Sequence, residues 1–168
     1  MTNWMRRAAT LSAGLVLAGG AAMATAPTAS ALVSGQLHPA SSGKCLGVYG
    51  MSTDNGTDAV QWDCNGNADQ RWSYSGVGGG YYTITNANSG KCLGVYGMDQ
   101  KNGAVAVQWD CNGNPDQQWY IDSVGNGAAH LINRNSGKCL GVYGGDTANG
   151  TIAVQWDCNG NPDQVWYS

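Results

Sequence analysis

The residues of this chain that could do chemistry are aspartates, histidines and cysteines; there is no glutamate. Hydrolysis by two carboxylates needs two acids at a set separation, one with a raised pKa, and Asp63 with Asp69 could supply such a pair. The pair recurs twice along the chain, however, and nothing marks one copy as special. A Ser-His-Asp arrangement would need His38 or His130, and neither lies near a nucleophile motif. We therefore expect no enzyme activity.

The cysteines form three pairs with one spacing. Six cysteines allow fifteen pairings. The repeat described below favours one of these, in which each unit closes its own pair. A zinc site is the alternative, but the spacing is not Cys-x-x-Cys, and the two histidines occupy non-equivalent positions. We expect no metal and no cofactor, and three disulfides: Cys45–Cys64, Cys92–Cys111 and Cys139–Cys158.

These residues belong to a threefold repeat with a period of 47 residues. The stretch GKCLGVYG begins at Gly43, Gly90 and Gly137, and each copy is followed by AVQWDCNGN and then by Gln-x-Trp. Solenoids normally have atypical terminal units, whereas the terminal units here resemble the middle one. The units, at 36–82, 83–129 and 130–168, therefore predict a closed, all-β barrel with threefold pseudo-symmetry.

Composition favours short strands over helices. Gly, Asn, Asp and Ser are turn formers, and no window has convincing 3.6-residue apolar periodicity. Asp54-Asn55-Gly56 indicates a turn, and the other units keep its glycine as Gly103 and Gly150. A calcium loop at Asp54 and Asp58 is less favoured, because the other units lack matching acids. In the first unit we predict strands near Gln36–Pro39, Lys44–Val48, Ala59–Asp63 and Trp72–Tyr74.

The first 31 residues have the pattern of a secretory signal peptide. Arg6 and Arg7 precede an apolar run, and Ala29-Ser30-Ala31 is a small-x-small cleavage site. A membrane anchor fits less well, because the run is short and ends in Pro27 and small residues. We expect cleavage after Ala31, a mature chain of residues 32–168, an extracellular location, and an oxidising compartment for the cysteines.

The charge balance bears on possible partners. The whole chain has a net charge of −3, and without Arg6 and Arg7 six basic residues face eleven acids. No basic cluster suits nucleic acid, and no second apolar stretch would span a membrane. The sequence leaves the oligomeric state open.

The motifs as a set resemble one family. Cys-Leu-x-Val, Gln-Trp-Asp-Cys-Asn-Gly and Gln-x-Trp, three times over, are similar to the ricin-B-type β-trefoil lectins, which include carbohydrate-binding modules of secreted bacterial glycosidases. The resemblance covers residues 32–168. It implies a six-hairpin β-trefoil with one potential sugar site per unit, and glycans or polysaccharide as partners.

The resemblance implies roles for the repeated aromatic and amide residues. Trp62 and its equivalents would stack on a sugar ring, although packing against the neighbouring hairpin is an equal alternative from the residues alone. Asn65 could bond a vicinal diol or form an Asn-Gly turn, and both can hold at once. Gln70 would support the site, and Trp72 would fill the core. The matching sets are Trp109, Asn112, Gln117 and Trp119, and Trp156, Asn159, Gln164 and Trp166.

The sequence departs from the family pattern at two positions in every unit. The family usually has an Asp just after Cys-Leu and an Asn just before the Gln of Gln-x-Trp. Here Gly47 occupies the first position and Asp69 the second. We hypothesise that the site keeps one acid, moved across the pocket, with Tyr49 adding a hydroxyl and an apolar face. In the alternative, the glycine clears space, the Asp caps a turn and the site is inactive. The other copies are Gly94, Asp116 and Tyr96, and Gly141, Asp163 and Tyr143.

Two functions follow from these features. The favoured one is a secreted lectin with up to three weak sugar sites that act multivalently and without catalysis. The alternative is a secreted protein-binding trefoil, such as a protease inhibitor, with degenerate sugar sites. Such trefoils use one long loop, whereas the three loops here are nearly equal in length.

Overall fold

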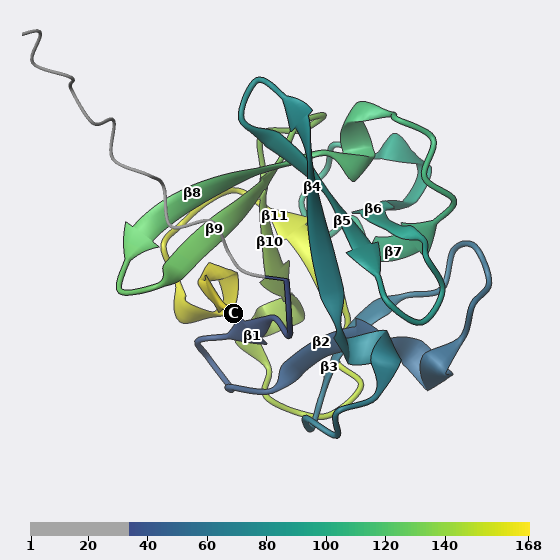
Figure 1. The fold of residues 1–168 in the computed structure, drawn as a ribbon. Helices are drawn as coiled ribbons and strands as arrows, with labels where there is room; N and C mark the ends of the chain where they lie inside the picture. Colours follow the sequence, from purple (N-terminus) through teal and green to yellow (C-terminus); the bar gives the residue numbers. More distant parts are fainter. Residues whose placement is uncertain (1–33) are drawn as a thin grey trace, which may run out of the picture.

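The computed structural model describes residues 34–168, so the expected signal peptide and its cleavage site lie outside the described residues. No described residue lies in an α-helix (Figure 1). The strands of the first repeat are β1 (His38–Pro39), β2 (Cys45–Val48), β3 (Ala59–Trp62) and β4 (Trp72–Gly78). Those of the second are β5 (Tyr81–Asn86), β6 (Cys92–Val95), β7 (Ala106–Trp109) and β8 (Trp119–Gly125), and those of the third are β9 (Ala128–Asn133), β10 (Cys139–Val142), β11 (Ala153–Trp156) and β12 (Trp166–Tyr167).

Two short 3₁₀ helices interrupt each repeat. One follows the second strand directly, and the other precedes the Trp of Gln-x-Trp. They are η1 (Tyr49–Met51) and η2 (Ala68–Gln70), η3 (Tyr96–Met98) and η4 (Pro115–Gln117), and η5 (Tyr143–Gly145) and η6 (Pro162–Gln164).

Six strands close a barrel. The antiparallel pairs β4–β5, β5–β8, β8–β9, β9–β12 and β12–β1 follow one another. A bridge between Gly35 and Trp72 joins β4 to the segment ahead of β1 and completes the ring. The remaining strands form three hairpins, β2–β3, β6–β7 and β10–β11. This arrangement confirms the predicted three-repeat β-trefoil.

The fourth strand is longer than the sequence predicts. β4 continues past Tyr74 to Gly78 and pairs with β5, with a register shift between Gly76 and Gly78. The shift is a β-bulge, in which one extra residue of β4 is left unpaired. The glycine-rich stretch can therefore continue in the sheet beyond it. The predicted border between the first and second repeats, at residues 82 and 83, lies within β5.

Each repeat contributes one buried tryptophan to the core. Trp72, Trp119 and Trp166 are no more than 1 % exposed and lie in a cluster with the leucines of the GKCLGVYG stretches. The indole Nε1–H of Trp72 donates to the carbonyl of Leu46 at 2.9 Å, and the other two repeats make the same bond. A buried indole N–H needs such a partner, so the bond fixes the depth of the ring.

The disulfides join the pairs expected from the repeat: Cys45–Cys64, Cys92–Cys111 and Cys139–Cys158. Each ties the first residue of a hairpin to the segment just after its second strand. The disulfide therefore fixes the start of the segment that follows the second cysteine, which begins with Asn-Gly in every repeat.

Neighbouring repeats hold each other through a buried glutamine. Gln108 is fully buried in β7, and its Nε2 donates to the carbonyls of Ser52 and Asp54, in the loop of the first repeat. Its backbone N–H donates to the carbonyl of Thr57, and its own carbonyl accepts from Gly56 N–H. Gln155 holds the loop of the second repeat in this way, and Gln61 holds the loop of the third. The contacts therefore run in a cycle.

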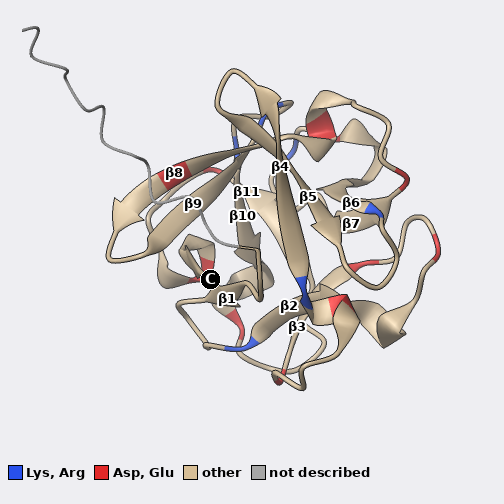
Figure 2. Ribbon diagram, in the orientation of Figure 1, with Lys and Arg blue, Asp and Glu red and all other residues tan. Residues whose placement is uncertain are grey.

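Charged residues reinforce the same contacts. Asp110 pairs with Lys91 of its own repeat and accepts a bond from Asn55 of the first repeat at 2.8 Å. Equivalent pairs form in the other repeats. Figure 2 shows the few Lys and Arg residues scattered over the ribbon rather than gathered on one element. Within residues 34–168, no helix is both long and apolar enough to cross a membrane.

Candidate functional site

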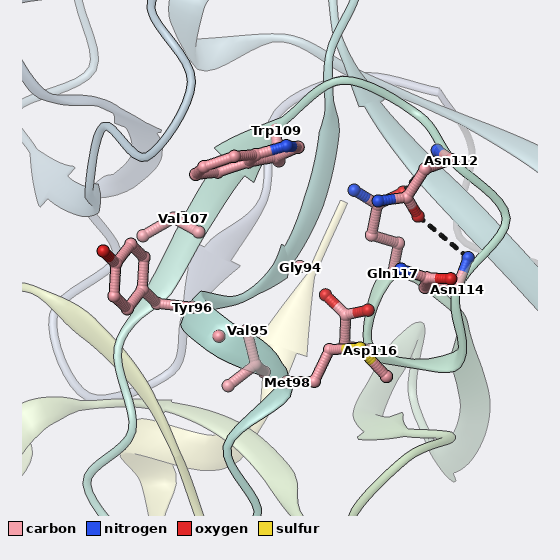
Figure 3. Close-up of a pocket in the computed structure, with 11 residues that line it drawn as sticks. Gly94, Val95, Tyr96, Met98, Val107, Trp109, Asn112, Asn114, Asp116 and Gln117 are labelled. Carbon is pink, nitrogen blue, oxygen red and sulfur yellow. Dashed lines mark hydrogen bonds between the residues drawn. The ribbon is translucent and has the colours of Figure 1, made fainter.

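Each repeat has an equivalent surface cavity at the open side of its hairpin, and a fourth cavity of about 490 Å³ lies between the first and second repeats, beside Asp58 and Val105. In the equivalent cavities the wall on one side is the 3₁₀ helix after the second strand, and the wall on the other is the Asn-rich segment after the second cysteine. Figure 3 shows this arrangement in the second repeat, with Trp109 and Tyr96 on one side, Asp116 and Met98 below, and Asn112 opposite. The cavities of repeats one, two and three have volumes of about 320, 270 and 460 Å³.

The sequence-predicted site residues meet in these cavities with one difference. Tyr49, Trp62, Asn65, Asp69 and Gln70 all line the first cavity. Their counterparts in the second repeat, Tyr96, Trp109, Asn112, Asp116 and Gln117, line the second. In the third repeat the lining includes Trp156, Asn159, Asp163 and Gln164 but not Tyr143, which is 53 % exposed.

The glycine after Cys-Leu is explained by the aspartate across the pocket. A Cβ at Gly47 would lie 2.8 Å from Oδ2 of Asp69 and 3.0 Å from Cγ of Gln70. The same positions in the other repeats, Gly94 with Asp116 and Gly141 with Asp163, would bring these atoms to 2.9 Å. In this structure the Asp69 side chain occupies the space that a side chain at Gly47 would need, so any larger residue at Gly47 would force the aspartate to shift.

The carboxylate at this position is buried beneath the cavity. Asp69 is 6 % exposed and Asp116 7 %, and in each the Oδ1 atom has no hydrogen-bond partner among the described residues. Burial raises the pKa of both carboxyl groups, and the backbone N–H groups of the aspartate itself and of Val48 or Val95 oppose that rise. Burial likewise raises the pKa of Asp163, which is half-buried. A buried acceptor without a partner is costly, and because Oδ1 is shielded from solvent, an outside donor reaches it only when the aspartate side chain turns toward the cavity.

The cavity tryptophans pack on one side and are open on the other. A Cβ at Gly150 would lie 3.4 Å from the ring of Trp62, so the indole rests against the loop of a neighbouring repeat. The ring is still 41 % exposed. Trp109 and Trp156 rest in the same way on Gly56 and Gly103. Packing and an accessible aromatic surface therefore coexist.

A tyrosine shares the wall in the second repeat. The rings of Tyr96 and Trp109 are edge-on, with centroids 6.4 Å apart and planes inclined at 64°. Such a pair presents two apolar surfaces at an angle to each other.

The asparagine after the second cysteine forms a turn. The Oδ1 of Asn65 accepts the backbone N–H of Asn67 at 2.9 Å. Its side-chain NH₂ has no partner within residues 34–168 and remains a donor at the cavity. Gln70 holds this segment from below: its Oε1 accepts the Asn65 N–H, and its Nε2 donates to the carbonyl of Asp63. The buried glutamine thus supports the asparagine.

The second repeated carboxylate lies outside the cavity. Asp63 is not among the lining residues and is bound by Lys44 and by Asn149 of the third repeat. These hydrogen bonds hold its pKa below the ordinary value. Asp63 is therefore engaged in joining repeats, and one aspartate lines each of the three equivalent cavities.

Residues that the sequence analysis missed also line the cavities. Asn67, Asn114 and Asn161 contribute to the three walls, and Met51 and Met98 to the first two. Both methionines have a φ of 55°, in the left-handed region that non-glycine residues rarely adopt. The repeat alignment contained one signal for this left-handed conformation: Met51 and Met98 align with Gly145, and glycine adopts this region freely.

The histidine nearest to a cysteine pair makes no metal centre with it. His38 Nδ1 lies 3.6 Å from Sγ of Cys45 and 3.7 Å from Sγ of Cys64. These sulfurs are bonded to each other, so they supply no thiolate ligand.

The fold and the three cavities define a class. Residues 33–109, 69–156 and 115–168 match the family described as "Ricin-type beta-trefoil lectin domain-like". The matches cover the described structure, and the chain belongs to this family.

Solved structures place the chain among particular relatives. It is 33 % identical to the designed threefold-symmetric protein ThreeFoil, with a TM-score of 0.78 over 79 % of this chain and 95 % of that one. It is 36 % identical to the exo-β-1,3-galactanase 1,3Gal43A from Clostridium thermocellum, with a TM-score of 0.78, covering 80 % of this chain but only 29 % of the galactanase. A ricin B-like lectin of Macrolepiota procera, solved with lactose, shares the fold at 20 % identity and a TM-score of 0.69, with coverages of 80 % and 92 %. Among curated protein sequences no significant match is found.

Proposed function

We propose that this chain is a secreted lectin with one sugar site per repeat and no catalytic activity. The observation that carries the proposal is the buried aspartate beneath an exposed tryptophan. Asp69 has an unpartnered Oδ1, and the Trp62 ring stands open beside it. A sugar ring supplies both complements, hydroxyl donors for the carboxylate and an apolar C–H face for the indole.

The contacts expected in each site follow from the donor inventory. Asp69 accepts from one or two sugar hydroxyls in short, charge-assisted bonds. The NH₂ group of Asn65 donates to a sugar oxygen, and Tyr49 offers a hydroxyl and an apolar face. This assignment favours the relocated acid over an inactive site, because the carboxylate keeps an acceptor oxygen without a protein partner.

Absence of catalysis is supported by the arrangement of the acids. Hydrolysis of a glycosidic bond by the usual mechanism needs two carboxylates flanking the bond. In the first repeat Asp69 lines the cavity, whereas Asp63 is held by Lys44 and Asn149 outside it. The galactanase relative is much longer than this chain, so its activity gives no reason to expect hydrolysis here.

Secretion is supported by the three disulfides, which persist in oxidising compartments. Multivalency is supported by the repetition of the cavity. Three sites on one rigid body bind a dense glycan surface more tightly than any one of them binds a free sugar, since tethering raises the effective concentration for the second contact.

Galactose-containing glycans are the first probes to try. The names of two relatives mention such sugars, a β-1,3-galactanase and a lectin solved with lactose. The test is a titration of the mature chain against a broad glycan panel that includes lactose and β-1,3-galactan. We expect weak binding of at least one glycan, and its loss in the triple variant Asp69→Ala/Asp116→Ala/Asp163→Ala.

An exposed-acid variant, Asp54→Ala, serves as the control, because Asp54 is exposed and lines none of the cavities. The proposal fails if no glycan on the panel binds, or if the triple variant binds as well as the unmodified chain. Release of reducing sugar from a bound polysaccharide would contradict the absence of catalysis.

A further inference from the structure

The third cavity is built differently from the other two, and the differences adjoin one another. Gly145 stands where the first two repeats have Met51 and Met98, and Ser41 stands where they have Asn88 and Asn135. Gly145 and Ser41 both line the third cavity, which is the largest of the three at about 460 Å³.

Two asparagines hold Met51 in place, and one, Asn135, donates to the carbonyl of Met98 at 2.9 Å. Asn88 Nδ2 donates to the carbonyl of Met51 at 2.9 Å, and Asn67 Nδ2 lies 3.3 Å from its Sδ. The methionine stays in its left-handed conformation, which is strained for a non-glycine residue and persists only where surrounding contacts enforce it. Figure 3 shows the equivalent Met98 side chain beside the Asp116 carboxylate. A methionine side chain therefore lines each of these cavities on the side of the acid, although it is largely exposed.

The third repeat lacks this side chain. A Cβ at Gly145 would lie 3.9 Å from Oδ1 of Asp163, so a side chain here would begin next to the carboxylate. With glycine the space is open, and Asp163 is half-buried, whereas Asp69 and Asp116 are buried. Beyond the gap, Ser41 presents a buried Oγ without a hydrogen-bond partner among the described residues. This Oγ is shielded from solvent, so a ligand reaches it once the serine side chain turns toward the cavity, where the hydroxyl can both donate and accept.

We propose that the third site binds an internal or branched sugar residue of an oligosaccharide, whereas the first two sites bind only terminal residues. This inference rests on the proposed sugar-binding function. A substituent on the sugar hydroxyl next to those bound by Asp163 passes over Gly145, and one of its hydroxyls reaches Ser41 Oγ. In the first two sites the same substituent meets Met51 or Met98.

The test reads each site separately in the intact protein. In ¹⁵N-labelled mature chain, the assigned indole N–H signals of Trp62, Trp109 and Trp156 report the three cavities. The probes are galactose and linear β-1,3-galactotriose. We expect galactose to shift all three signals with similar affinity. We expect the trisaccharide to bind at Trp156 about three- to tenfold more tightly than galactose does, which is the gain from one or two added hydrogen bonds, and to gain nothing at Trp62 and Trp109.

Reciprocal variants exchange the difference. Gly145→Met should remove the trisaccharide preference at Trp156 and leave galactose binding there. Met51→Gly should create a preference for the trisaccharide at Trp62 alone, and this change suits the positive φ of that position. Ser41→Ala should reduce trisaccharide binding at Trp156 by about threefold and leave the other two signals unchanged.

The outcomes separate this inference from the function on which it rests. Equal trisaccharide-to-galactose ratios at the three tryptophans, or a Gly145→Met variant that keeps the preference, would overturn the inference while leaving the lectin function intact. Absence of any indole shift with either probe would contradict galactose-type binding at these cavities, and the inference would fall with it.

Discussion

At the residue scale, the pairing of a glycine with a buried aspartate is the central feature of each site. Gly47 and Asp69 come from different elements, yet the carboxylate fills the volume beside the glycine Cα. Each residue therefore constrains what the other can be. A side chain at Gly47 would displace the Asp69 side chain, and an acidic one would also place two carboxylates side by side.

The first prediction concerns the volume beside this glycine. We expect Gly47→Ala to destabilise the fold by about 1–3 kcal/mol, the usual cost of overpacking, and to weaken sugar binding at Trp62. The new Cβ would lie too close to Asp69 and Gln70 for either to stay in place. Chemical denaturation and the Trp62 indole signal measure the two effects.

Another glycine in a strand supplies the matched control. At Gly76 a Cβ would meet only Tyr82, at 3.8 Å, so Gly76→Ala should be tolerated. A second test restores the family's usual pair of residues. The double variant Gly47→Asp/Asp69→Asn should be more stable than the single variant Gly47→Asp. Equal stabilities of the single and double variants would contradict the coupling.

The second prediction concerns pH. Burial raises the pKa of Asp69 above its ordinary value of 3.8, so the stability this group contributes is complete below 3.8 and is lost as the pH rises through the folded-state pKa. Asp69→Asn should therefore stabilise the fold at pH 7 by about 1 kcal/mol, the lower end of the cost of a buried unpartnered polar atom, with a smaller gain in acid.

The same variant should lose sugar binding at Trp62, because an amide accepts a hydroxyl less strongly than a carboxylate does. Unfolding free energies at neutral and acid pH, with sugar titrations alongside, test both effects, and Asp58→Asn is the control for an exposed acid. A pH-independent difference, or a destabilised Asp69→Asn, would show that the carboxylate is satisfied within the fold.

At the scale of elements, each repeat uses two tryptophans on opposite sides of one hairpin. Trp72 lies in the core with its indole N–H bonded to the carbonyl of Leu46, while Trp62 at the end of β3 lies against the loop of the third repeat and lines the cavity. The exposed Trp62, which ends β3, is therefore available to a ligand, whereas the buried Trp72, which begins β4, stabilises the core.

The third prediction separates these tasks. Trp72→Ala should cost about 3–5 kcal/mol of stability, as core Trp→Ala changes do. Trp62→Ala should cost about 1–2 kcal/mol, because the ring is only partly buried, and should abolish binding at its own cavity. Denaturation curves and site-resolved titrations measure the contrast. If Trp62→Ala unfolds the chain as readily as Trp72→Ala does, the exposed ring is mainly structural.

Much of the element level was predictable from sequence, because a repeat samples the same pattern three times. The β-trefoil, the disulfides and the buried Trp72 set follow from spacing alone or from the family resemblance. The left-handed conformation of Met51 had only one sequence signal, its alignment with Gly145, since nothing local distinguishes a strained methionine from a relaxed one. The role of Gln61 was also hidden, because its partners Asp146 and Ala148 lie in another repeat. Contacts between distant segments and backbone strain are properties of the assembled fold.

At the scale of the whole molecule, three similar cavities are fixed on one barrel. The barrel closes through β12–β1 and the Gly35–Trp72 bridge, so the sites cannot move independently. On the proposed function, a dense glycan surface would meet several sites whose relative positions are already set, and this would limit the entropy lost when the second site binds.

The fourth prediction follows from this geometry. Relative to the unmodified chain, Trp62→Ala/Trp109→Ala should bind an immobilised polysaccharide roughly 10²-fold more weakly, while the affinity of the remaining site for a free monosaccharide stays constant. Surface binding assays and solution titrations supply the two numbers. Equal losses in both assays would mean that the sites act alone.

The cyclic contacts between repeats have a consequence for how such a molecule can be assembled. Each repeat offers its loop to the glutamine of the next, and the third offers its loop to Gln61 of the first. This is a head-to-tail interface whose rotation closes after three steps, the geometry that generates rings from separate subunits. A chain carrying one repeat therefore has the surfaces needed to form a C₃ homotrimer, and the covalent links between repeats act as tethers in an assembly that symmetry already specifies.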